Sequence, residues 1–182
     1  MDFNFLSLFV LVPLLMLLGL WLAKGMKGVR AVMVVGSSIL LAMAIALTIK
    51  FIGDRAAGNT DEMLYVMGFT WFEPLHISYT VGVDGISVAM LLLSAVIVFT
   101  GTFVSWDMNK DYFLWFTLLS MGVFGFFIAI DMFMMFMFYE IALIPMYLLI
   151  GVWGSGHKEY SAMKLTLMLM GASAFLMMGI FG

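Results

Sequence analysis

One carboxylate, Glu140, lies inside the long apolar segment FMFYEIALIPMYLLI, which covers residues 136–150. A carboxyl group can take up and release a proton, and acids inside membrane helices often mark proton or ion pathways. An acid at the centre of a membrane helix costs at least about 2.5 kcal/mol on insertion scales. We therefore expect Glu140 to face protein or water, and we favour a transport role over a purely structural hydrogen bond.

Pro145 and Tyr147 follow Glu140 in the same segment and are predicted to support it. Because Pro145 has no N–H group, the carbonyl of Ile141 loses its usual helical donor one residue from the acid. That carbonyl can bind water or a cation, although a kink that serves only packing is an equal alternative. Tyr147 lies seven residues after Glu140 on the same helical face, so its hydroxyl can extend a polar path.

Lys164, in the first turn of the last apolar run, is the second candidate for proton translocation. We favour a side chain that extends to the membrane interface, and the alternative is a second charge on the same relay. His76 is expected to be a hydrated surface histidine, because no second histidine or acid lies at ligand spacing.

The sequence contains no catalytic residue set and no nucleotide, flavin, haem or metal motif. It also contains no cysteine, which excludes disulfides and cysteine-ligated clusters within it. Any redox chemistry is therefore expected in a partner protein.

The composition predicts an integral membrane protein. Of the 182 residues, 65% are hydrophobic and 10% are charged, with a mean hydropathy of +1.16. A soluble domain is about half apolar and a quarter charged. The net charge of −3 is small and there is no basic run, so we expect no nucleic-acid partner.

Six apolar runs are each close to the roughly 20 residues that a helix needs to cross about 30 Å of hydrocarbon. The predicted fold is therefore all-α, a single membrane domain over residues 1–182 with about six transmembrane helices, five complete and the sixth truncated. Glu140 lies nine residues after Asp131, so it is about 13 Å deep and close to the midplane. The predicted spans are 4–23, 31–52, 85–105, 112–130, 132–153 and 162–182.

The polar segment 53–84, between the second and third spans, is predicted to form a small β-hairpin on the outer surface. Polar and apolar residues alternate from His76 to Val81, which is typical of a half-buried strand. The preceding LYVMGFTW is also rich in strand-forming residues, and Glu73-Pro74 is expected to form the turn.

The basic residues predict the orientation. The odd-numbered connections and the span ends beside them have six, whereas the even-numbered connections have two, so the N-terminus is predicted outside. The six are Lys24, Lys27, Arg30, Lys110, Lys158 and Lys164, and the two are Lys50 and Arg55.

Three segments, VDGISVAMLLL (83–93), YEIALIPMYLLIGVWG (139–154) and YSAMKLTLMLMGASAFLMMGIFG (160–182), resemble a known family. They are similar to the antiporter-like, proton-pumping membrane subunits of respiratory complex I, among them the subunit called M in bacteria. The resemblance implies that Glu140 is the fifth-helix glutamate central to proton translocation. It also implies that Lys164 is the lysine at the start of the sixth helix, and that the chain is the N-terminal portion of such a subunit.

The resemblance further implies a non-redox subunit of a translocase, an NADH–quinone oxidoreductase. FMN, iron–sulfur clusters and quinone would belong to partner subunits, and the neighbours would be other membrane subunits, including antiporter-like ones. The expected location is a bacterial cytoplasmic membrane or an organelle inner membrane. Two alternatives stay open, a subunit of a multisubunit cation/proton antiporter and a structural or assembly subunit.

Overall fold

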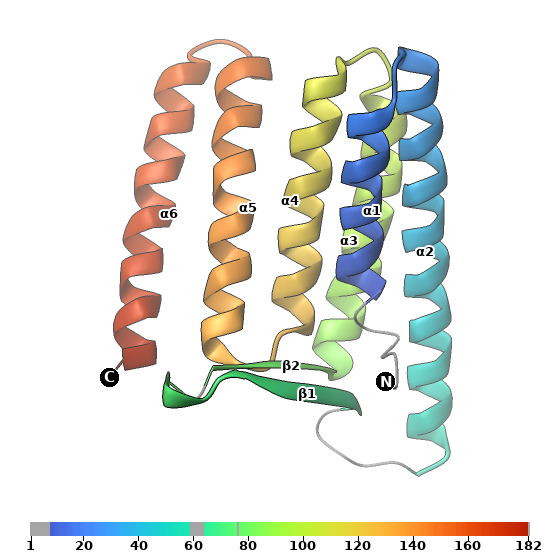
Figure 1. Ribbon diagram of the computed structural model, residues 1–182, viewed down its shortest axis with the longest axis vertical. Coiled ribbons are helices and arrows are strands. Elements are labelled where there is room, and N and C mark those ends of the chain that lie inside the picture. The colour runs from blue at the N-terminus through green and yellow to red at the C-terminus, as the bar shows by residue number, and fades with distance from the viewer. Residues whose placement is uncertain (1–7, 59–63, 76, 182) are drawn as a thin grey trace.

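Six upright helices form the protein, and a two-stranded hairpin lies across one end of them (Figure 1). This computed structural model describes residues 8–58, 64–75 and 77–181. His76 therefore lies outside the described residues, as do residues 4–7 of the first predicted span. The elements are α1 (Leu8–Leu22), α2 (Met26–Ala56), β1 (Leu64–Phe72), η2 (Glu73–Leu75), β2 (Ile77–Val83), α3 (Gly85–Val104), α4 (Lys110–Ile128), α5 (Met132–Trp153) and α6 (Lys158–Phe181).

The multi-helix membrane fold predicted from composition is confirmed. Helices α2 to α6 are each long and apolar enough to cross a membrane, and the described part of α1 has 15 residues. Two helices are longer than their predicted spans. Helix α2 covers Met26–Ala56, where 31–52 was predicted, and α6 begins at Lys158, where the predicted span began at residue 162. Hydropathy marks where hydrocarbon ends, whereas a helix can continue through the head-group region because lysine and arginine side chains there reach water.

The core lies mainly among α1, α2, α3 and α4, and residues of β2 and of the first half of α5 also belong to it. The rings of Phe9 on α1 and Phe124 on α4 are fully buried, with centroids 5.7 Å apart. Gly36 on α2 lies so close to Met16 on α1 that an added Cβ would overlap the methionine side chain. A small residue at this position therefore lets α1 and α2 approach, as in many membrane helix pairs.

The hairpin lies at one end of the bundle, where β2 contacts the connection between α4 and α5. Strands β1 and β2 are antiparallel, with Gly68 opposite Thr80, and η2 makes the turn at Glu73–Leu75. Val81 is fully buried and forms a bridge with Ala129, and the N–H of Ile130 donates to the carbonyl of Thr80 at 3.0 Å. These contacts fix β2 to the connection between α4 and α5.

Helices α5 and α6 extend the bundle to one side (Figure 1). Helix α5 packs closely on α4, and α6 packs mainly on α5 and stands at the edge. Most side chains of α6 are exposed, and only Ala162 and Ser173 are buried. The interface between α5 and α6 therefore has one wall inside the bundle and one at its margin.

Candidate proton-transfer site

Helix α5 determines the depth of Glu140. The Asp131 carboxylate caps the start of this helix, accepting hydrogen bonds from the N–H groups of Phe133 at 2.9 Å and Met134 at 3.2 Å. From Met132, the first helical residue, Glu140 is eight residues along, or about 12 Å. The whole helix of 22 residues is about 33 Å long, so the acid lies in its middle third.

Glu140 faces α6 across a cleft of about 360 Å³. Its Oε1 atom is buried and has no hydrogen-bond partner among the described residues. Buried polar atoms are nearly always hydrogen-bonded, and an unpaired one is costly. The carboxyl group is therefore placed to bind a proton or a polar partner. Besides Glu140, the cleft is lined by Phe136, Met170, Ser173, Ala174 and Met177.

Two hydroxyl groups near the acid converge on a carbonyl of α6. Ser173 Oγ donates to the carbonyl of Leu169 at 2.9 Å, and Tyr139 Oη donates to the same carbonyl at 3.4 Å. The Ser173 oxygen keeps its acceptor capacity, which suits a protonated carboxyl group as donor. The cleft thus combines one titratable group with one acceptor on the opposite helix.

Pro145 is buried, and α5 continues through it without a break in the helix. The carbonyl of Ile141 still receives no N–H from this position, because proline has none to donate. Tyr147 is 39% exposed, and no described hydrogen bond joins its hydroxyl to Glu140, about 10 Å away along the axis. The supporting roles of Pro145 and Tyr147 stay predictions.

Lys164 is not brought to the acid. Because α6 begins at Lys158, Lys164 is its seventh residue and lies beyond the first turn in which it was predicted. Its side chain is exposed, with Nζ 6.0 Å from the centroid of the Tyr160 ring. Ser173, which lies beside Glu140, is nine residues further along α6, or about 14 Å. A role for Lys164 in proton transfer also stays a prediction.

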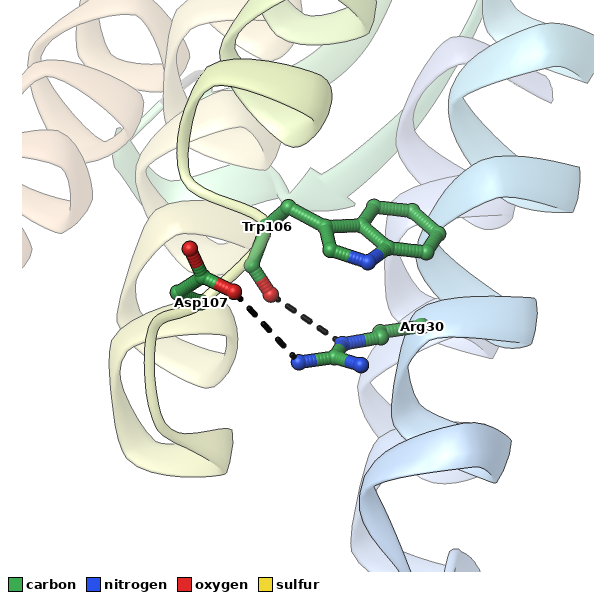
Figure 2. A network of polar contacts seen from close by, with 3 residues as sticks. All are labelled: Arg30, Trp106 and Asp107. Carbon is green, nitrogen blue, oxygen red and sulfur yellow. Dashed lines mark hydrogen bonds and ion pairs between the residues drawn. The ribbon is translucent and has the colours of Figure 1, made fainter.

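The sequence did not reveal a polar network at the opposite end of the bundle from the hairpin (Figure 2). Arg30 Nε on α2 donates to the carbonyl of Trp106 at 3.1 Å, and the guanidinium lies 5.2 Å from the Trp106 ring centroid. A guanidinium nitrogen is 3.9 Å from the Asp107 carboxylate. The one sequence feature that could have indicated this network is the Trp106-Asp107 pair, which directly follows the third apolar run.

Two lysines at the same end also donate hydrogen bonds to backbone carbonyls. Lys110 Nζ donates to the carbonyls of Trp21 and Ala23, at 3.2 and 2.9 Å, where α1 ends. Lys158 Nζ donates to the carbonyl of Val152 at 3.0 Å, where α5 ends. Cations near helix C-termini satisfy free carbonyls and interact favourably with the helix dipole. Half of the basic residues at this end therefore have a structural role.

The comparisons with known proteins cover the segment of the chain that contains this cleft. Residues 129–182 match the family described as NADH:quinone oxidoreductase/Mrp antiporter, TM, a segment that contains both α5 and α6. Over 98% of its length the chain is 32% identical to an NAD(P)H-quinone oxidoreductase chain 4 of Synechococcus. The chain is therefore similar to the antiporter-like membrane subunits that this family groups together. Both walls of the Glu140 cleft lie in the segment that the family model covers.

Other relatives of this antiporter-like chain come from plants and archaea. It is 36% identical to the chloroplast NAD(P)H-quinone oxidoreductase chain 4 of Daucus carota over 64% of its length, which is 24% of that protein. It is 26% identical to F(420)H(2) dehydrogenase subunit M of Methanosarcina mazei over 97% of its length, 35% of that subunit.

A solved structure shares the fold. A chain of the membrane-bound sulfane sulfur reductase, an archaeal respiratory membrane complex, superposes with a TM-score of 0.74 at 19% identity. The match covers 97% of the present chain and 36% of the other. The antiporter-like chain therefore spans about a third or less of the length of these relatives, including the Synechococcus protein, of which it covers 34%.

Proposed function

We propose that this antiporter-like chain contributes to proton translocation in an NADH–quinone oxidoreductase, with Glu140 as the group that takes up and releases the proton. The observation that supports this most directly is the buried Oε1 of Glu140, which has no described partner and lies in the cleft between α5 and α6. The cleft lies in the segment matched by the family model, and the relatives include quinone oxidoreductase chains.

In this proposal the chain provides no redox centre. FMN, iron–sulfur clusters and quinone belong to partner subunits, and their electron transfer moves a positive charge toward or away from Glu140. An approaching cation favours the ionised carboxylate and releases the proton, whereas its withdrawal favours uptake of a proton. The Ser173 oxygen accepts a hydrogen bond from the protonated form. Tyr147, seven residues after Glu140 on α5, and Lys164, nine residues before Ser173 on α6, extend the path toward the end opposite the hairpin.

The test is Glu140→Gln in the complete subunit within the intact complex. Glutamine keeps the size of the side chain but cannot bind and release a proton, so we expect proton pumping per electron to fall several-fold. Glu159→Gln is the matched control, because Glu159 is exposed near the start of α6 and loses the same charge. Subunit assembly is checked by native electrophoresis. Unchanged pumping in an assembled Glu140→Gln complex would show that the proposal is wrong.

A multisubunit cation/proton antiporter is the second candidate, because the description of the matched family names both kinds of complex. The two functions differ in their partners. Co-purification of flavin- and iron–sulfur-containing subunits with the chain supports the oxidoreductase, and a purified particle without them supports the antiporter.

We also propose a bacterial cytoplasmic membrane or an organelle inner membrane as the location, with the N-terminus outside. The supporting observation is that all six basic residues of the odd-numbered connections and adjacent helix ends lie toward the end of the bundle opposite the hairpin. A protease site inserted between α2 and β1 is then cleaved from the outer side of sealed cells. Cleavage only after the membrane is opened contradicts this orientation.

A further inference from the structure

An apolar groove of about 420 Å³ runs between α1 and α2 on the outside of the bundle. The side chains along it are partly open to the surroundings, with Leu15 56% and Val35 57% exposed. Helix α2 is long and apolar enough to cross a membrane, so this apolar surface suits contact with hydrocarbon better than contact with water. The groove is lined by Val12, Leu15 and Gly19 of α1 and by Ala31, Val35 and Ile39 of α2, among others.

The length of the groove corresponds to one leaflet. From Ala31 to Ile39 the groove follows α2 for about 12 Å. Half of a hydrocarbon core about 30 Å thick is about 15 Å. The groove therefore begins near the membrane surface at the α1–α2 turn and ends near the midplane, as an acyl chain of one leaflet does.

Two lysines, Lys24 and Lys27, lie at the upper end of this groove. Lys27 is four residues before Ala31 and thus on the same face of α2 as the groove. Both lysine side chains are exposed, and neither makes a hydrogen bond or ion pair with a described residue. The α1–α2 turn itself contains no acidic residue, and the acids at this end of the bundle are Asp107, Asp111 and Glu159, on the α3–α4 connection and in the first turns of α4 and α6.

Three of the other four basic residues at this end differ from these two. Arg30, Lys110 and Lys158 each bind backbone carbonyls, so their positive charges are used within the protein. The indole of Trp21, directly before the turn, is 72% exposed, as expected of an aromatic side chain at the membrane interface. The turn therefore presents two lysine charges that make no hydrogen bond or ion pair with the described residues, and these charges lie above the apolar groove.

We propose that α1, α2 and their turn bind an anionic phospholipid, with an acyl chain in the groove and the phosphate head group at Lys24 and Lys27. Juxtamembrane lysines attract anionic lipids electrostatically, and the acyl chain covers the exposed apolar side chains of the groove. The site is independent of Glu140, which lies on the opposite side of the bundle from α2 (Figure 1).

The head-group half of the proposal is tested with the intact purified protein, reconstituted in nanodiscs of phosphatidylcholine with increasing phosphatidylglycerol. Retained lipid is counted by native mass spectrometry. We expect a preference for phosphatidylglycerol that falls about 10-fold or more in the Lys24→Gln/Lys27→Gln variant. Lys164→Gln, which removes one exposed charge from the same end of the bundle, is expected to change it less than about 2-fold. The proposal would be overturned if the double variant preferred phosphatidylglycerol as strongly as the wild type does. It would also be overturned if inorganic phosphate alone bound as well as phosphatidylglycerol.

The acyl-chain half is tested with a matched pair of substitutions on α2. Ala31→Phe fills the groove below Lys27, whereas Ala46→Phe adds the same ring at an exposed position outside it. We expect the first to abolish retention of the specifically bound lipid and the second to preserve it. A photoreactive amino acid at position 35 should form a lipid adduct. An adduct with another protein subunit, or unchanged retention in Ala31→Phe, would refute the lipid site.

Discussion

Replacing Gly122 with alanine is expected to push α4 and α5 apart at the level of the proton-transfer site. An added Cβ would lie 2.9 Å from the backbone nitrogen and from the Cβ of Ala142, and 3.0 Å from its Cα. Ordinary contacts of a Cβ start at 3.4 Å, so the helices must separate by about 0.5 Å. Rotation of a side chain cannot relieve the overlap, because two of the three atoms are backbone. Ala142 is two residues after Glu140, so this shift also moves the acid.

The cost of this overlap is expected to be about 1–3 kcal/mol, the usual range for overpacking a close contact. Gly171→Ala on α6 is the matched control, since its added Cβ meets nothing within 4 Å. Both substitutions gain about 1 kcal/mol of helix propensity, so the difference between the two variants isolates the overlap. For a chain of 150–250 residues this difference corresponds to about 2–12 °C in Tm.

The measurement is thermal unfolding in detergent, followed by tryptophan fluorescence and repeated for wild type, Gly122→Ala and Gly171→Ala. We expect Gly122→Ala to unfold at a lower temperature than Gly171→Ala. If the two variants unfold within about 1 °C of each other, α4 and α5 are not as close at this position as the structure places them. The inference that the contact between Gly122 and Ala142 helps to position Glu140 would then be wrong.

Two further predictions concern polar contacts at the helix ends. Arg30→Met removes the hydrogen bond to Trp106 and the contact with its ring, so we expect a loss of about 1–2 kcal/mol in thermal unfolding. Asp107→Asn should leave stability unchanged, because this side chain is fully exposed, and a clear loss would assign the network to the ion pair. Asp84→Ala removes the acceptor of the 2.8 Å hydrogen bond from Ser87 N–H at the start of α3, with an expected cost of about 1 kcal/mol. Asp84→Asn should preserve most of that stability, and equal losses in both variants would contradict the capping role.

The sequence predicted the position of Glu140 along its helix, because that position depends only on the rise of a helix and on where the helix begins. The count from Asp131 was about 13 Å, and the capped start of α5 places the acid about 12 Å from Met132. The sequence did not predict what the carboxyl group faces. Residues of α6 form the other wall of the cleft, and their distance from Glu140 in the sequence is about 30 residues.

The relation of Lys164 and Tyr147 to the acid was also beyond sequence reasoning. Spacing along a helix places Tyr147 on the same face as Glu140, but packing leaves its ring partly exposed and without a described hydrogen bond to the acid. For Lys164 the start of α6 decides the position, and at that start the Lys158 side chain contacts the end of α5. Such a contact between two helices has no periodic signal in the sequence.

Six spans were predicted, and five helices of the described residues are long and apolar enough to cross a membrane. By itself the sequence determined the apolar, multi-helix character of this protein, the place of the buried acid on its helix and the family resemblance. Each of these follows from composition or from local periodicity, because about 20 apolar residues in a row have few other stable structures. Tertiary structure alone decided which helices are neighbours, where the basic side chains bind and which surfaces stay open. These depend on close fit between distant segments, such as Gly122 against Ala142, and on whether a lysine finds a carbonyl. Glu140 is thus placed by its own helix and given its surroundings by another.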